Sequence, residues 1–147
     1  MVKVLIKKLN PTVQLPEYKT KGASGMDLVA FLKNPINVKS KTSSLIPTGI
    51  SVAFSEKYEI QIRPRSGLAI KNNISVLNTP GTIDSDYRGE IKVIIYNHGE
   101  KDFIINNGDR IAQMILVPVI KMELEEIDNL SETIRGKGGF GSTGKWI

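Results

Sequence analysis

The sequence predicts an all-β protein, a sandwich or barrel of short strands. Its apolar residues mostly alternate with polar or small ones, and this period of two is typical of half-buried strands. The runs are rich in β-branched residues and bounded by Gly, Asn, Asp or Pro, which favour turns. The sequence carries no sustained helical period, apart from one or two turns expected in SGLAIKN (66–72).

Alternation is clear at Ile50, Val52 and Phe54, which are separated by Ser51 and Ala53. The same reasoning places strands at residues 50–54, 58–62, 90–97, 102–106 and 110–120. Residues 78–97 are interpreted as a β-hairpin with its turn at 84–89. The composition shifts only at residue 135, so we expect one domain, residues 1–134, and a flexible arm, residues 135–147.

Composition excludes several classes of function. The 147 residues suffice for one domain with a hydrophobic core, and the absence of cysteine excludes disulfides and thiolate sites. Lysines interrupt the apolar run MVKVLIKKLN, so we expect no signal peptide, no membrane partner and a cytoplasmic location. The net charge is +5, but the lysines are scattered and aromatic residues make up only 6%, so nucleic acid is not an expected partner.

The stretch RGKGGFGSTG (135–144) is half glycine and has too little apolar surface to fold alone. It matches G-x-G-x-x-G twice and approaches the Walker spacing. Neither match is followed by the helix that would hold a phosphate, and Trp146 stands where the Walker motif needs Ser or Thr. Both matches are therefore rejected.

Two interpretations of this stretch remain open. One is a disordered, solubilising tail. The other is an arm that orders over a nucleotide: Arg135 can chelate a phosphate and Phe140 offers a stacking face. The glycine N–H groups, including that of Gly141, and the hydroxyls of Ser142 and Thr143 can donate to a phosphate.

RPRSGLAIKN (63–72) leaves an alternating strand and enters the expected helix. The N–H groups of Ser66 and Gly67 would lack partners within the helix, so a phosphate could accept from them beside the Arg65 guanidinium. The alternative is a strand–turn–helix junction with Ser66 as the N-cap.

The predicted hairpin carries three functional groups of different kinds. Asn78 offers an amide donor and acceptor for a base edge, Asp84 can orient a water, and Tyr87 presents a flat wall. Acidic residues are also common in turns for backbone reasons, so ordinary turn chemistry remains an alternative.

Two further polar residues stand in apolar surroundings. Asp27 lies in SGMDLVA (24–30), where a buried turn acid is the simpler interpretation. Gln113 lies in GDRIAQM (108–114), a turn that enters a strand, where it can simply be an outward position of the alternation.

In order and spacing, these segments resemble the five motifs of the trimeric dUTPases (deoxyuridine triphosphate nucleotidohydrolases). SGMDLVA, RPRSGLA, the hairpin with GTIDSDYRGEI, GDRIAQM and RGKGGFGSTG together span residues 24–144. The resemblance implies a distorted jelly roll (a β-clip or dUTPase-like barrel) assembled as a homotrimer, with active sites at the subunit interfaces. It also implies hydrolysis of dUTP to dUMP and pyrophosphate, which limits uracil incorporation into DNA and supplies dUMP for dTTP synthesis.

The resemblance also implies roles for single residues. Asp84 would position the water that attacks the α-phosphorus, and Tyr87 would pack under the deoxyribose. The uracil edge would be read by the hairpin, through Asn78, Thr82, Ile83 and Lys92. Phosphates would be held by Arg65, Ser66, Gly67 and Gln113.

The remaining implied roles concern the metal and the arm. Asp27 would contact the waters of a Mg²⁺ ion that the triphosphate itself carries. The arm would cross to another subunit's site, with Phe140 on the uracil and Arg135 at the terminal phosphates, together with Gly141, Ser142 and Thr143.

Three alternatives to a dUTPase follow from the same residues. A dCTP deaminase of the same fold needs a glutamate on the return strand, where this chain has Ile94. A non-enzymatic nucleotide- or nucleic-acid-binding module would bind DNA with a steep salt dependence. A regulator with the dUTPase fold would carry a second role that one sequence does not mark.

Overall fold

The computed structural model describes residues 1–142 and 144. Among these residues the chain forms eleven short strands and one helix. The strands are β1 (Leu5–Lys8), β2 (Met26–Val29), β3 (Ile36–Val38), β4 (Ser43–Pro47), β5 (Ile50–Ala53), β6 (Tyr58–Arg63), β7 (Ile74–Val76), β8 (Gly81–Ile83), β9 (Lys92–Asn97), β10 (Phe103–Ile105) and β11 (Arg110–Pro118). The helix is α1 (Ser66–Asn72). The predicted all-β class is therefore confirmed.

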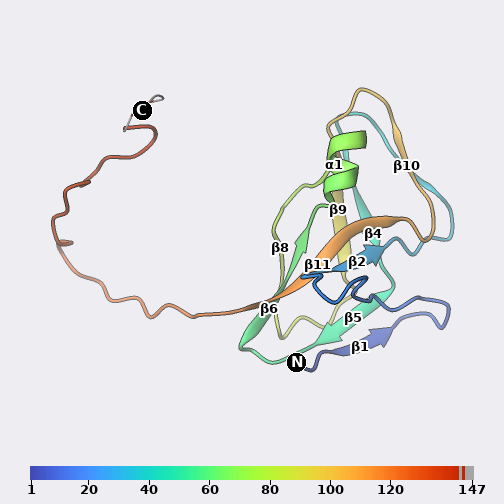
Figure 1. Ribbon diagram of the computed structural model, residues 1–147, viewed down its shortest axis with the longest axis horizontal. Helices are drawn as coiled ribbons and strands as arrows, with labels where there is room; N and C mark the ends of the chain where they lie inside the picture. Colours follow the sequence, from blue (N-terminus) through green and yellow to red (C-terminus); the bar gives the residue numbers. More distant parts are fainter. Residues whose placement is uncertain (143, 145–147) are drawn as a thin grey trace.

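All the strand pairs are antiparallel. One sheet has the order β2–β11–β6–β8 and a second has the order β4–β9–β7, while β1–β5 and β10–β3 form separate pairs (Figure 1). β11 lies between β2 and β6, and an irregularity in its pairing with β2 falls between Arg110 and Ala112. This strand therefore joins distant parts of the sequence.

The core collects the inward-facing residues of these sheets. β9 alternates in burial, with Val93, Ile95 and Asn97 buried, and β6 buries Ile60 and Ile62. Of the buried polar groups, the Asn97 side chain is satisfied by backbone partners: its amide donates to two carbonyls and its oxygen accepts one N–H. Satisfied in this way, Asn97 is buried without the penalty of unpaired polar atoms.

The predicted hairpin at residues 78–97 needs a correction. β8 pairs with β6, whereas β9 pairs with β4 and β7, so the two expected arms lie in different sheets. Both partners of β9 are antiparallel to it, and the Leu77 N–H extends the pairing with β7 by donating to the Ile94 carbonyl at 2.8 Å. Residues 78–91 form a long connection between β7 and β9. Within this connection, β8 pairs with β6 of the neighbouring sheet.

The helix predicted in SGLAIKN is confirmed as α1. Its N-cap is Arg65, in an extended conformation and without a side-chain capping bond, so the alternative that made Ser66 the N-cap is wrong. At the other end Asn73 adopts the left-handed conformation, with φ 56°, and its N–H donates to the Ala69 carbonyl. Asparagine tolerates this conformation, which commonly ends helices.

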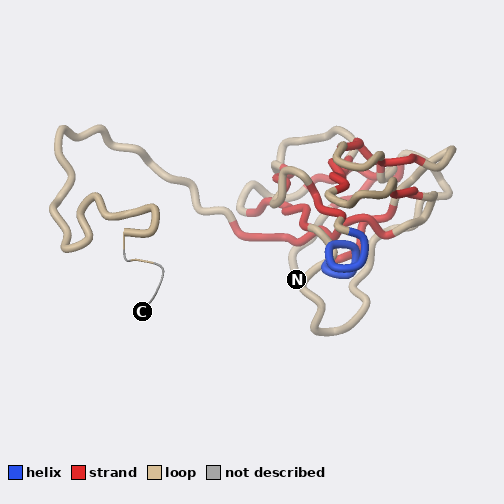
Figure 2. The backbone as a smooth tube through the Cα atoms, turned by 90° about the horizontal axis from the view of Figure 1, so that it is seen from above, coloured by secondary structure: helices blue, strands red, loops and turns tan. Residues whose placement is uncertain are grey.

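The chain beyond β11 leaves the body of the molecule. The Val119 N–H still donates to the Lys57 carbonyl at 2.9 Å, and the chain then runs outward to residue 142, drawn in orange to red at the left of Figure 1 and again clear of the body in Figure 2. Within residues 1–142 and 144, no helix is long and apolar enough to cross a membrane.

Candidate functional site

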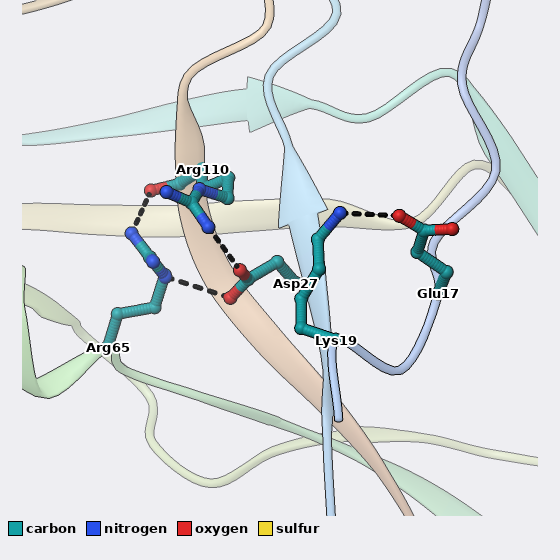
Figure 3. A network of polar contacts seen from close by, with 5 residues as sticks. All are labelled: Glu17, Lys19, Asp27, Arg65 and Arg110. Carbon is teal, nitrogen blue, oxygen red and sulfur yellow. Dashed lines mark hydrogen bonds and ion pairs between the residues drawn. The ribbon is translucent and has the colours of Figure 1, made fainter. Parts of the chain in front are cut away.

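Asp27 bridges two arginines at the junction of three chain segments (Figure 3). Its Oδ1 lies 2.8 Å from Arg65 Nε and its Oδ2 lies 3.3 Å from Arg110 Nη1. Arg65 also donates from Nη1 to the Arg110 carbonyl, at 3.1 Å. The Asp27 and Arg65 side chains are only 20% and 26% exposed, whereas Arg110, at 53%, lies at the surface. The network leaves one excess positive charge beside the start of α1.

Asp27 lies on β2, so its interpretation as a turn acid is wrong. Its pairing with β11 places it opposite Gln113, and Gln113 in turn lies opposite Arg63 of β6. The Gln113 amide donates to the Pro64 carbonyl at 3.0 Å, which ties it to the segment that precedes the helix. Three of the five predicted motifs are therefore brought together by the register of one sheet.

Ser66 and Gly67 are exposed at the start of α1, directly after Arg65. A Cβ added at Gly67 would meet no atom within 4 Å, so the space above this backbone is open. With Arg65 and Gln113 beside it, the surface can accept an anion, since guanidinium and amide groups are donors and the field is positive.

The segment from Asn78 to Lys92 holds the second group of predicted residues. Asn78, Thr82, Asp84 and Tyr87 are exposed, and Ile83 is half-buried. A tight turn forms where the Tyr87 N–H donates to the Asp84 carbonyl at 3.1 Å. Because β8 pairs with β6, which leads into the Arg65 segment, one strand supports both groups.

Asn78 and Lys92, at the two ends of this segment, each lie close to a neighbouring residue. The Asn78 side chain lies over Gly81, since a Cβ there would approach its Nδ2 to 3.1 Å. The Lys92 ammonium lies 3.6 Å from a Glu90 carboxylate oxygen.

The predicted arm residues lie apart from both groups. Arg135 donates from Nε to the Gly138 carbonyl at 2.8 Å, within the arm itself. Phe140 is fully exposed, and Gly141 and Ser142 are exposed beside it. Thr143 and Trp146 lie outside the described residues. The arm extends from the body in both views (Figures 1 and 2), so one chain does not bring it to its own candidate site.

Sequence reasoning missed two residues of this site. Arg110 shares Asp27 with Arg65, although it stands within the motif GDRIAQM that was noted for Gln113. Glu90 follows the loop and its carboxylate accepts the Gly49 N–H at 2.9 Å. The signal at both positions was a charged residue that begins a predicted strand, which is too common to single out a role.

These features define a class of protein: an antiparallel β scaffold that presents guanidinium groups and exposed loop carboxylates, suited to a phosphorylated substrate. The sequence model of the family described as dUTPase matches residues 12–144. The chain belongs to the dUTPase family.

Two similar curated proteins are the deoxyuridine 5'-triphosphate nucleotidohydrolases of Rickettsia conorii and Rickettsia prowazekii. Each is 56% identical over 145 residues, covering 98% of both chains. A solved dUTPase of Staphylococcus bacteriophage 80alpha, with dUPNHPP, matches with a TM-score of 0.87 and 25% identity over 97% of this chain and 98% of that one. A dUTPase from phage phi11 of S. aureus, described with a structural Mg(II) ion, has the same fold at a TM-score of 0.79, with 20% identity over 88% of this chain and 99% of that one.

Proposed function

We propose that this protein is an enzyme that hydrolyses dUTP to dUMP and pyrophosphate. The observation that carries the proposal is the match to the dUTPase family over residues 12–144 together with the Asp27–Arg65–Arg110 cluster and the Asp84–Tyr87 loop on one sheet. The reaction removes a source of uracil in DNA and supplies the precursor of dTTP.

The proposed chemistry rests on the loop. Asp84 takes a proton from the water that attacks the α-phosphorus, and positioned base catalysis of this kind contributes about 10²–10⁴ in rate. The exposed Asp84 side chain can reach such a water. Tyr87 packs against the deoxyribose and leaves no room for a 2′-hydroxyl.

The phosphate chain lies against the first group of residues. Arg65 supplies charge, and Ser66, Gly67 and Gln113 supply neutral donors. The uracil edge is read on the other side, by the Asn78 amide and by the chain at Thr82, Ile83 and Lys92.

Mg²⁺ is the proposed cofactor, and the residues fit only a substrate-carried ion. Within the described ranges, 1–142 and 144, no three His, Cys, Asp or Glu side chains gather to hold a metal. Mg²⁺ keeps several waters and commonly needs one carboxylate besides substrate phosphates, a part that Asp27 can fill through water. The ion would neutralise phosphate charge while Arg65 and Gln113 hold the oxygens.

A homotrimer is the proposed assembly, and the segment after β11 supports it. Ile120, Met122 and Leu124 are 93%, 85% and 86% exposed and alternate with Lys121 and Glu123. An extended chain with every second residue apolar gains stability by lying on another surface. We further propose that residues 1–134 form the domain and 135–147 the arm, which brings Arg135, Phe140, Gly141, Ser142 and Thr143 to a neighbouring subunit's site.

The test is pyrophosphate release from dUTP, dCTP, dTTP and UTP with Mg²⁺, for the wild type and Asp84→Asn. We expect release from dUTP alone and a loss of at least about 10²-fold in the variant. Release from several nucleotides would contradict the reading of uracil and sugar. Ammonia release from dCTP would favour the deaminase, and DNA binding without hydrolysis would favour the binding module.

A further inference from the structure

The position of the Tyr87 side chain depends on Glu90, the residue that follows the loop. Tyr87 is 44% exposed, and its side chain folds back over Gly89, where an added Cβ would lie 2.3 Å from the Tyr87 hydroxyl oxygen. That hydroxyl donates to the Glu90 carbonyl at 3.0 Å. The orientation of the ring therefore depends on where the backbone of Glu90 is held.

Glu90 is held by the corner between β4 and β5. Its Oε1 accepts the Gly49 N–H at 2.9 Å, and its side chain is only 21% exposed. A carboxylate that accepts a backbone N–H makes a charge-assisted bond, about twice as strong as a neutral one. The next residue continues the attachment, since the Ile91 N–H donates to the Ile50 carbonyl at 2.9 Å.

The corner itself is rigid. Gly49 has φ +70°, and a Cβ there would lie 2.6 Å from a Val13 methyl carbon and 3.0 Å from the Phe31 ring. Thr48 is buried, and its hydroxyl donates to the Ile91 carbonyl at 2.6 Å. The hydrogen bond from the Gly49 N–H to the Glu90 carboxylate therefore restrains the end of the loop against a rigid part of the body.

The other partner of the Glu90 carboxylate contributes less. Lys92 Nζ lies 3.6 Å from Oε2, and the lysine side chain is 44% exposed. Exposed ion pairs of this kind contribute about 0–1 kcal/mol. Of the two contacts of the Glu90 carboxylate, the bond to Gly49 is therefore the stronger restraint on the loop.

We propose that Glu90 is a positioning residue that fixes Tyr87 through the Gly49 N–H and so sets the discrimination between deoxyribose and ribose. This inference rests on the proposed function, in which Tyr87 contacts the sugar. Without the carboxylate the Glu90 backbone is held to the corner only through Ile91, and the Tyr87 ring moves with the carbonyl that its hydroxyl contacts. The space beside the 2′ carbon then opens and UTP becomes a better substrate.

The test is the ratio of kcat/KM for dUTP to that for UTP. We expect Glu90→Ala to lower this ratio about tenfold, the effect of one lost hydrogen bond of ordinary strength. Glu90→Gln keeps an oxygen that can accept the Gly49 N–H, so it should restore most of the ratio. In the Tyr87→Phe background, Glu90→Ala should lower the ratio no further, because both changes remove the same link. An unchanged ratio in Glu90→Ala, or fully additive effects in the double variant, would overturn the proposal.

A second measurement does not depend on any nucleotide. Arg88 is exposed in the loop, so trypsin cleavage after it reports how often the loop opens. Cleavage should be faster in Glu90→Ala than in the wild type, and unchanged in Glu100→Ala, whose side chain is 86% exposed at another turn. Equal rates in Glu90→Ala and wild type would refute the anchor. A wild type that hydrolyses no nucleotide would refute the proposed function, and the cleavage rates would still decide whether Glu90 holds the loop.

Discussion

Asp102, directly before β10, binds β3 and the turn that follows β3 through its carboxylate. It accepts the Asn37 amide at 2.8 Å and the Ser40 N–H at 3.0 Å. The hydrogen bond from Asn37, followed by that from Ser40, holds the pKa of Asp102 below its usual value. Both bonds favour the ionised form and therefore stabilise the folded chain wherever the carboxylate is charged.

The stabilisation that Asp102 contributes depends on pH. A lowered pKa in the folded chain means stabilisation that is present above the unfolded value, about 3.9, and lost as the pH falls through the folded value. We expect Asp102→Ala to unfold at a lower urea concentration than the wild type at pH 7, with the difference shrinking below about pH 4. Urea titrations of both proteins, at one protein concentration and at several pH values down to below about pH 4, measure this difference. A difference that stays constant with pH would show that the charge is irrelevant.

Residue types indicated candidate site residues but not the contacts that those residues make. Arg65, Asp27 and Gln113 were found because each lies in a recognisable motif, and the register of β11 does bring them together. The sharing of Asp27 with Arg110 was not predictable, because it depends on the pairing of β2 with β11 across more than 80 residues of sequence. The Glu90 contact depends likewise on a corner 41 residues away.

The corner between β4 and β5 offers a test at the level of an element. A Gly49→Ala side chain would be strained by φ +70° and would meet Val13 at 2.6 Å, whereas Gly108, with φ +86°, has no atom within 4 Å of an added Cβ. We expect Gly49→Ala to cost about 2–4 kcal/mol and Gly108→Ala only about 1–2 kcal/mol, the backbone part alone. Thermal unfolding of both variants at one concentration compares them. Equal losses would show that packing at the corner is not tight.

The longer strands were all predictable, and of the short ones β5 and β10 were also expected, at residues 50–54 and 102–106. β6, β9 and β11 contain six to nine residues, enough for the period of two to be read. β3, β7 and β8 contain three residues each, too few to establish a period. The hairpin was wrong because turn residues at 84–89 indicate a reversal of the chain, but do not reveal that Thr82 pairs with Gln61.

The whole molecule combines a packed body with an unpacked end. From Ile120 to Ile134 the apolar side chains are 54% to 110% exposed, whereas the core residues are at most 3% exposed. The first part of this segment alternates apolar and charged residues, which suits pairing against another subunit. The glycine-rich part has no such pattern and suits reversible closure over a ligand.

Deleting residues 135–147 separates these two roles. Because the alternating residues Ile120, Met122 and Leu124 remain, we expect the shortened chain to keep its oligomeric state. Its kcat for dUTP should fall by about 10²-fold, since the loss of Arg135 and the closing arm removes charge stabilisation and lets water into the site. The complementary variant carries Ile120→Ser, Met122→Ser and Leu124→Ser with the arm intact. We expect this variant to assemble more weakly than the wild type. Sedimentation and turnover of both variants decide the matter: unchanged turnover without the arm would exclude it from catalysis, and dissociation on its deletion would place the subunit contact beyond residue 134.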